Sequence, residues 1–252
     1  ADRQLEFTQV DLEMSFVDEP DVQALVEGLL KKVWKECLNV EIQTPFMHMT
    51  WDDAMNNYGS DKPDTRFEML LNNISEWAVT TECGFFKSAV ENGGAVKCIV
   101  AKDAANKYSR KDLDRLTLLA KKYHAGGLAW LKLENGLFNG SVAKFISEDK
   151  ANELINQLTL TNNDLVLIVA DKLANCNQSL GALRLQLGRE LDLIDNDKFN
   201  FLWVVDWPLF EYNEEEGRFE AAHHPFTSPK DGDEDKLLSD PANCHAKAYD
   251  IV

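Results

Sequence analysis

The first forty residues carry two different hydrophobic patterns. Between Phe7 and Phe16, polar and apolar residues alternate, which predicts a half-buried β-strand. After this stretch, Asp18 can cap a helix and Pro20 suits the first helical turn. Apolar residues then recur at helical spacing, at Val22, Leu25, Val26, Leu29, Leu30, Val33 and Trp34. The turn-rich stretch 56–66 that follows predicts an exposed loop.

Between about residue 67 and about residue 195, patterns typical of strands alternate with patterns typical of helices. Short apolar runs predict buried strands at 96–100, 128–133 and 165–169. Ser109 and Ser147 each stand before a helical pattern and can cap it. A further helix is indicated by leucines at steps of three and four, at Leu180, Leu183, Leu187 and Leu191.

The last part of the chain returns to antiparallel patterns. Residues 201–212 and 218–222 flank an acidic turn and predict a hairpin. We therefore expect an α+β fold, in which an antiparallel framework formed by 1–66 and 196–252 is interrupted by an inserted α+β domain at 67–195. Both outer pieces are too short to build separate cores, so we expect them to share one sheet.

Composition limits the classes of function. The 252 residues include 26 Lys and Arg against 43 Asp and Glu, which gives a net charge of −17. Because a phosphate backbone is bound through Lys and Arg, this charge excludes a general affinity for nucleic acid, although local basic patches stay compatible with it. No run approaches the roughly 18 apolar residues of a membrane span, and no signal segment opens the chain.

The five cysteines and the two chain ends add two expectations. The cysteines are odd in number, far apart and without a CxxC pair, so reduced thiols in a cytosolic protein are expected. The chain has no initiating Met, and it stops inside the expected strand 249–252. We therefore expect a fragment of a longer chain.

The first candidate site is the alternating segment near the N-terminus. Alternation places Phe7, Gln9, Asp11 and Glu13 on one strand face. An aromatic ring can stack on a nucleotide base, and a carboxylate can hold an ammonium group. The alternative is a sheet whose polar face is simply hydrated.

The second candidate site is the histidine pair His223–His224. Adjacent residues leaving a strand point to opposite sides, so one imidazole can face a pocket and the other can support the backbone. An imidazolium is a good partner for a substrate carboxylate. A metal site that also uses Cys244 and His245 is an alternative, although no known zinc spacing matches. A purely structural loop is the third possibility.

The third candidate is the segment 58–64, with the sequence YGSDKPD. Lys62 could contact phosphate or RNA, but Ser60 or Asp61 capping a turn explains the residues as well. The chain contains no P-loop, no GxGxxG fingerprint and no GxSxG nucleophile elbow. No catalytic triad is indicated.

Taken together, these segments resemble bacterial-type aspartyl-tRNA synthetases. The strings are DRQLEFTQVDLE at 2–13, YGSDKPD at 58–64, LGALR at 180–184, WVVDWPLF at 203–210 and HHPFTSPKD at 223–231. The region 67–195 is similar to the insertion domain, called the GAD domain, that these enzymes share with the B subunit of the tRNA-dependent amidotransferase. The resemblance implies part of a class II catalytic sheet interrupted by this insert.

The resemblance also implies an activity and site residues. The family activates aspartate with ATP and Mg²⁺ and transfers it to tRNA. By position, Gln4 and Phe7 would contact ATP, whereas Asp11, His223 and His224 would bind aspartate. The resemblance assigns no protein-bound metal and implies a cytoplasmic homodimer whose partners are tRNA, aspartate and ATP, without membrane or DNA.

Departures from the family pattern leave one alternative open. Leu5 stands where the family usually has Pro. Motif 1, part of motif 2 and motif 3 are not found in the chain, so we expect the chain by itself to be inactive. The alternative is a non-catalytic tRNA- or protein-docking module related to the amidotransferase B subunit, with Lys107, Arg110 and Lys111 as candidate contacts or simply as a solvated helix face.

Overall fold

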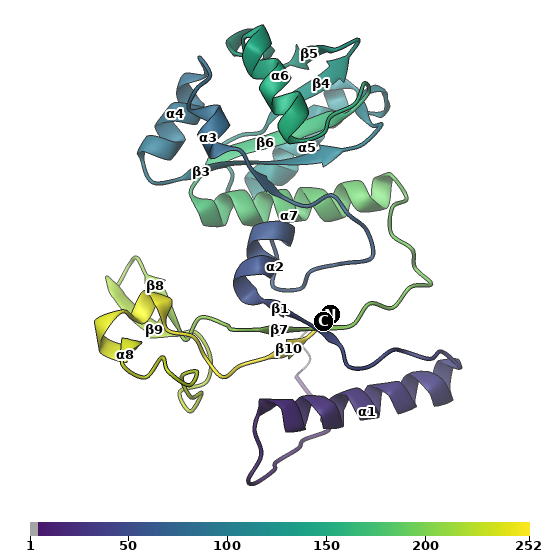
Figure 1. Cartoon of the computed structure of the whole chain (residues 1–252), viewed down its shortest axis with the longest axis vertical. Coiled ribbons are helices and arrows are strands. Elements are labelled where there is room, and N and C mark those ends of the chain that lie inside the picture. Colours follow the sequence, from purple (N-terminus) through teal and green to yellow (C-terminus); the bar gives the residue numbers. More distant parts are fainter. Residues whose placement is uncertain (1–4) are drawn as a thin grey trace. The chain divides into compact units, whose positions relative to one another are not determined.

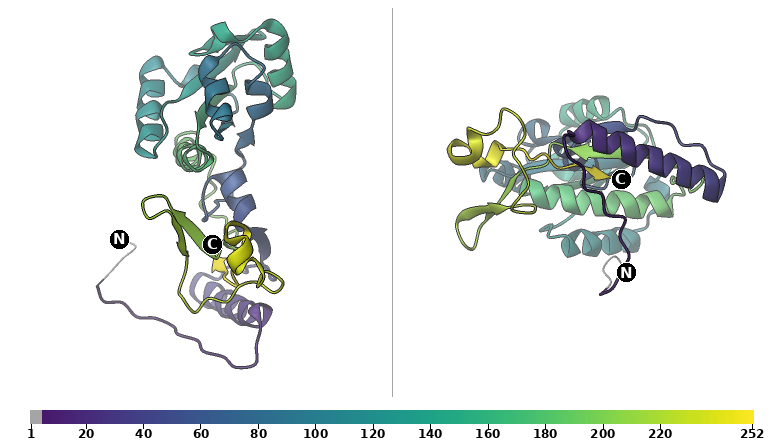
Figure 2. Two further views of the ribbon diagram at one scale, coloured as in Figure 1. Left: turned by 90° about the vertical axis from the view of Figure 1, so that its left-hand side faces the viewer. Right: turned by 90° about the horizontal axis from the view of Figure 1, so that it is seen from below.

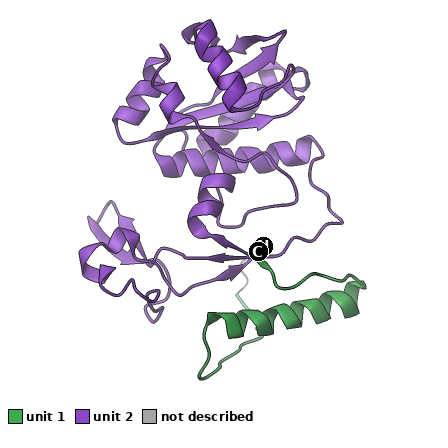
Figure 3. Ribbon diagram, viewed as in Figure 1, with its two compact units in different colours: residues 1–47 green, residues 48–252 purple. Residues whose placement is uncertain are grey.

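The computed structural model describes residues 5–252 and divides into two compact units, 1–47 and 48–252 (Figure 3). The first unit contains one helix, α1 (Glu19–Leu38), which begins where the capping signals predict. The backbone N–H of Asp18 donates to the Asp21 carboxylate at 3.0 Å, and Asn39 ends the helix in the left-handed region with φ 54°. The Glu27 carboxylate accepts from the backbone N–H of Phe46 at 3.0 Å and ties the helix to the chain that follows it.

The predicted strand between Phe7 and Phe16 is wrong. The structure has no strand there, and the side chains of Phe7 and Val10 are 70% and 78% exposed. Alternation marks a residue pattern that fits a sheet, but a strand forms only where a neighbouring backbone accepts its hydrogen bonds. Residues 5–46 contain no strand that offers such a backbone.

A five-stranded antiparallel sheet organises the second unit (Figure 1). Its strands, in spatial order, are β2 (Asn72–Asn73), β3 (Ala95–Ala101), β6 (Leu165–Asp171), β4 (Ala129–Glu134) and β5 (Leu137–Gly140). Every residue of β3 is buried, as expected for a strand covered on both faces. The strands predicted at 96–100, 128–133 and 165–169 are confirmed.

Helices cover both faces of this sheet. One face packs against α5 (Arg110–Lys122) and α7 (Leu173–Glu190), and the other packs against α3 (Ser75–Ala78), α4 (Gly84–Glu91) and α6 (Glu148–Gln157). Neighbouring residues of β6 alternate between the two cores: Leu167 faces the first and Ile168 the second. Single turns of 3₁₀ helix lie at η1 (Ala105–Lys107) and η2 (Ala143–Phe145). Ser109 and Ser147 cap α5 and α6, as predicted, each accepting a backbone N–H at 3.4 Å.

A second, three-stranded sheet joins the two outer parts of the sequence. Its order is β1 (Met47–Thr50), β7 (Leu202–Val205) and β10 (Asp250–Ile251), and β7 pairs antiparallel with β10. The expectation that the outer pieces share one sheet is confirmed for these strands. The predicted hairpin is shorter than expected and consists of β8 (Phe210–Asn213) and β9 (Arg218–Ala221). Two short helical turns, α8 (Lys236–Ser239) and η3 (Pro241–Asn243), precede β10.

The helix α2 (Trp51–Tyr58) lies between α7 and the three-stranded sheet, as Figures 1 and 2 show. Thr50 caps it by accepting from the Asp53 backbone N–H at 3.0 Å. The prediction of an exposed loop at 56–66 is wrong in two respects: the helix continues to Tyr58, and only Asn56 and Lys62 of this stretch are exposed. Its C-terminus meets α7 at two glycines. A Cβ at Gly59 would lie 2.1 Å from the Asn177 carbonyl oxygen, and one at Gly181 would lie 2.6 Å from the Gly59 carbonyl oxygen. The two backbones therefore touch directly.

This close approach can be tested with two glycines that share a left-handed backbone. Gly59 has φ +69°, and Gly93 has φ +79° but no heavy atom within 4 Å of an added Cβ. We expect Gly93→Ala to lower the free energy of unfolding by about 1 kcal/mol, the cost of the left-handed conformation alone. Gly59→Ala adds the clash with α7 and should cost about 3 kcal/mol or more. Urea denaturation of both variants measures the difference, and equal losses would contradict the direct backbone contact.

Candidate functional site

The histidine pair lies in a loop that crosses from β9 to α8. The backbone N–H of Thr227 donates to the His224 carbonyl at 2.9 Å and closes a turn. Two further backbone hydrogen bonds, from Lys230 to the His245 carbonyl at 2.8 Å and from Lys247 to the Ser228 carbonyl at 2.9 Å, hold the loop along the neighbouring segment. Lys230 also forms an ion pair with Asp206. The loop is therefore fixed at its far end by backbone pairing and charge.

His223 is half-buried and packs edge-on against a tryptophan. Its ring centroid lies 5.4 Å from that of Trp207, with the planes at 82°. Trp207 is itself held, because its Nε1 donates to the Val204 carbonyl at 2.9 Å. The His223 Nε2 atom is buried and has no hydrogen-bond partner among residues 5–252. A buried polar atom without a partner is costly, so this nitrogen is suited to bind a group that the chain itself does not provide.

His224 has a different environment. Its side chain is exposed, its Nδ1 accepts from the Phe226 backbone N–H at 3.2 Å, and its ring lies 4.8 Å from the Phe226 ring. The two adjacent imidazoles thus differ as the sequence suggests for neighbours on a strand. His224 supports the turn, while the buried Nε2 of His223 has no hydrogen-bond partner in the described chain.

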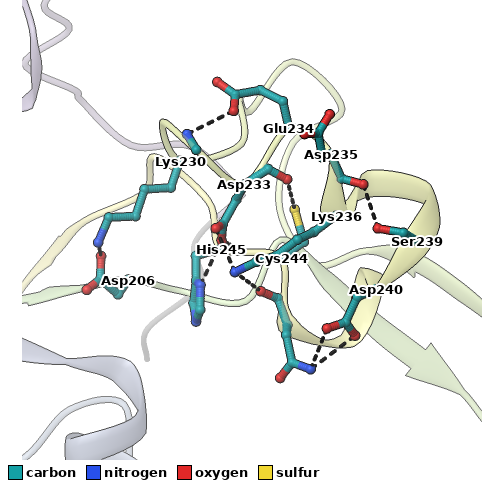
Figure 4. Close-up of polar contacts among 12 residues, drawn as sticks. Asp206, Lys230, Asp233, Glu234, Asp235, Lys236, Ser239, Asp240, Cys244 and His245 are labelled. Carbon is teal, nitrogen blue, oxygen red and sulfur yellow. Dashed lines mark hydrogen bonds and ion pairs between the residues drawn. The ribbon is translucent and has the colours of Figure 1, made fainter.

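A carboxylate organises the chain beyond the histidine loop (Figure 4). Asp233 binds the Lys236 ammonium at 2.7 Å and accepts from both the backbone N–H and the ring Nδ1 of His245, each at 2.9 Å. The hydrogen bond from Lys236, followed by those from His245, holds the pKa of the Asp233 carboxyl well below its usual range. Asp233 therefore joins α8 to the segment against which the histidine loop is paired.

The same contacts bear on the metal alternative. Cys244 is buried and its thiol donates to the Asp233 carbonyl at 3.6 Å, while His245 binds the Asp233 carboxylate. Throughout the described range 5–252, no three His, Cys, Asp or Glu side chains are grouped so that they could hold a metal ion. All five cysteines are free thiols. These contacts assign Cys244 and His245 to the support of the loop.

The candidate residues near the N-terminus belong to the 1–47 unit. Gln4 lies outside the described residues. Phe7 and Asp11 lie in an extended, exposed segment without strand structure. Their expected roles in binding ATP and aspartate stay predictions.

The sequence did not single out Asp233 or Trp207 as site residues. Asp233 stands in the charged run DGDED, where it looks like one more surface acid. Trp207 is part of the string at 203–210, but nothing in that string indicates which residue touches a histidine. Both roles depend on contacts over sequence separations of 12 and 16 residues.

As for membranes, the helices of residues 5–252 include none with the length and apolar character to cross a bilayer.

Replacing Asp233 tests how the loop is held. We expect Asp233→Asn to weaken the pairing along the loop, so that the Lys230 and Lys247 amides exchange hydrogen several-fold faster at neutral pH. Because the pKa of this carboxyl is lowered in the folded chain, its stabilising contribution is present above the unfolded value of about 3.9 and is lost as pH falls below it. The exchange difference from the unchanged chain should accordingly shrink below about pH 4. Asp235→Asn is the control, and a similar effect there would contradict the specific role of Asp233.

Known proteins resemble the chain along its whole length. The family model described as "tRNA synthetases class II (D, K and N)" matches residues 1–252. The chain is 56% identical to an aspartate–tRNA ligase of Staphylococcus carnosus, 53% identical to one of Macrococcus caseolyticus, and 56% identical to an aspartate–tRNA(Asp/Asn) ligase of Bacillus cereus strain AH187. Each match covers 100% of this chain and 43% of the relative. The chain thus spans less than half the length of these relatives, and it belongs to the class II tRNA synthetases of the aspartate, lysine and asparagine group.

Proposed function

We propose that this chain is part of an aspartate–tRNA ligase. The observation that carries the proposal is the identity of 53–56% to proteins of that name across the full chain, flanking segments included. The complete protein would activate aspartate with ATP and transfer it to tRNA. A stand-alone docking module would share only the region 67–195 with such ligases, so the matching flanks favour the enzyme.

The proposed division of the chain follows the two sheets. We assign 1–66 and 196–252 to the class II catalytic domain and 67–195 to the GAD-like insert. All five strands of the larger sheet, together with α3 to α7, fall inside the insert. The β1–β7–β10 sheet takes its strands from the two outer segments alone.

Aspartate recognition is assigned to the histidine loop and to Asp11. His223 carries a buried Nε2 with no partner in the described chain, at the position where the family binds the side-chain carboxylate of aspartate. A ring N–H donated to a carboxylate is a charge-assisted hydrogen bond. His224 would shape the turn beside it, and Asp11 would hold the α-ammonium group.

ATP binding is assigned to Gln4 and Phe7, with the exposed ring of Phe7 as a stacking surface for adenine. Mg²⁺ would enter with ATP and neutralise phosphate charge, and the chain's own residues supply no grouped set of ligands for it within 5–252. The work of this chain's residues is therefore to orient aspartate and the adenine ring. Positioning and charge stabilisation, not acid–base chemistry, then account for the rate.

The remaining proposals concern partners and place. The complete protein would bind tRNA, form a homodimer and work in the cytoplasm, where charged tRNA is used. The 252-residue chain by itself is expected to show no aspartate-dependent exchange of pyrophosphate into ATP, because it spans 43% of its relatives.

Pyrophosphate exchange with the complete protein tests the proposal. We expect exchange with aspartate and not with lysine or asparagine. His223→Ala should raise KM for aspartate about 10- to 100-fold, the loss of one hydrogen bond to a charged group, and leave KM for ATP unchanged. His124→Ala, an exposed histidine of the insert, is the control. Absence of aspartate-dependent exchange, or an unchanged KM for aspartate in His223→Ala, would contradict the assignment.

A further inference from the structure

A buried arginine holds the backbone at the end of the loop 59–66 and directly after it. Arg184 of α7 is 1% exposed and donates to four backbone carbonyls. Its Nη2 reaches the carbonyls of Asp64 at 3.0 Å, Phe67 at 2.7 Å and Glu68 at 3.0 Å, and its Nε reaches that of Met69 at 3.0 Å. The guanidinium also lies over the ring of Phe67, 3.9 Å from its centroid. One side chain of the proposed insert thus fixes the backbone that leads from the loop into the larger sheet.

This arrangement carries an energetic cost. Burial lowers the pKa of Arg184 to about 10, and its donors all go to uncharged carbonyls. A buried cation without a bonded carboxylate is a poor source of stability, but it specifies one backbone path. The loop gains further ties, since Asp64 binds Arg66 through two hydrogen bonds of 3.0 and 2.8 Å and the Asn200 amide donates to the Thr65 carbonyl at 3.1 Å.

Above this support lies a shallow hollow of about 250 Å³. Its lining includes Lys62 and the ion-paired Asp64 and Arg66 from the loop, together with Lys198, Phe199, Phe201 and Val252. Both lysine side chains are exposed, and neither ammonium group has an ion pair or hydrogen-bond partner within the described chain. Phe199 is 41% exposed. The hollow therefore combines two unpaired cations with an aromatic surface.

We propose that this hollow is a contact site for the RNA backbone, in which Lys62 and Lys198 bind phosphate oxygens and Phe199 packs against a ribose or base. The proposal rests on the function proposed above. Basic grooves with exposed aromatic rings are the usual means of binding single-stranded nucleic acid. On a chain with a net charge of −17, RNA is repelled generally, so a hollow that combines two unpaired lysines with an aromatic ring is a place where RNA can dock. Arg184 is then a positioning residue, because it binds the backbone of Asp64 and of 67–69 and does not itself line the hollow.

The test uses the complete protein and its tRNA over a range of salt concentrations. We expect Lys62→Ala with Lys198→Ala to weaken tRNA binding about tenfold or more at 0.1 M salt, and to reduce the slope of log affinity against log salt by about 1.5, as for two lost phosphate contacts. Lys121→Ala with Lys122→Ala removes the same charge from exposed positions at the end of α5 and is the matched control.

Each result has a definite meaning. Unchanged affinity and slope in the Lys62/Lys198 variant would overturn the proposal, and so would an equal loss in the control, which would show only a response to net charge. A raised KM for ATP in the same variant would assign the hollow to the nucleotide and overturn it as well. Aspartate-dependent pyrophosphate exchange by the unchanged protein needs no tRNA, so its absence would contradict the proposed function separately.

The positioning role of Arg184 can be tested separately by measuring tRNA affinity in Arg184 variants. Arg184→Lys keeps the charge but cannot reach four carbonyls, so it should weaken tRNA binding through the loop. In a double-mutant cycle with Lys62→Ala, the two losses should be less than additive, because both act through the same phosphate contact. Additive losses in a variant that keeps the native near-ultraviolet circular dichroism would remove Arg184 from the proposal.

Discussion

Two buried cations specify the path of the backbone in the second unit by donating to uncharged oxygens. Lys97 of β3 donates to the Asn56 carbonyl at 2.8 Å and to the Asn177 side-chain oxygen at 2.7 Å, and burial lowers the pKa of its ammonium. Arg184 of α7 does the same for the chain that follows α2. Gly59 and Gly181 also bring the backbones of α2 and α7 into direct contact. The path from the smaller sheet into the larger one is thus specified by charge and backbone contact, and not only by apolar packing.

Local signals in the sequence correctly predicted those helices and strands that carry their own capping residue or their own apolar face. Ser109 begins α5 with Leu113 and Leu116 inward, and the apolar run at 165–169 forms the centre of β6. The alternating segment after Phe7 has an equally clear pattern, yet it forms no strand. A strand forms only when a second strand pairs with it, and the alternating pattern says nothing about that second strand. Alternation therefore predicts which face a strand would bury but not that the strand forms.

In the candidate site, too, the sequence indicates which residue types could bind a ligand but not which contacts they make. The sequence indicates that one of two adjacent histidines can face a ligand, and the structure distinguishes them through Trp207 on one side and Phe226 on the other. Asp233 and Arg184 could not be recognised in this way. Each acts on segments 12 to 120 residues away, and no short spacing records such a contact. Sequence patterns therefore do not identify the residues that support a site by binding backbone atoms far away in the sequence.

Net charge and local charge act at different ranges. A total of −17 repels a polyanion at distances where screening is incomplete, while an unpaired lysine acts within one Debye length of about 8 to 10 Å. Two lysines near the smaller sheet are neutralised, Lys230 by Asp206 and Lys247 by Asp231. Cations that stay unpaired on such a surface retain their full attraction for phosphate. An acidic protein can therefore bind RNA selectively, because repulsion elsewhere removes the competing orientations.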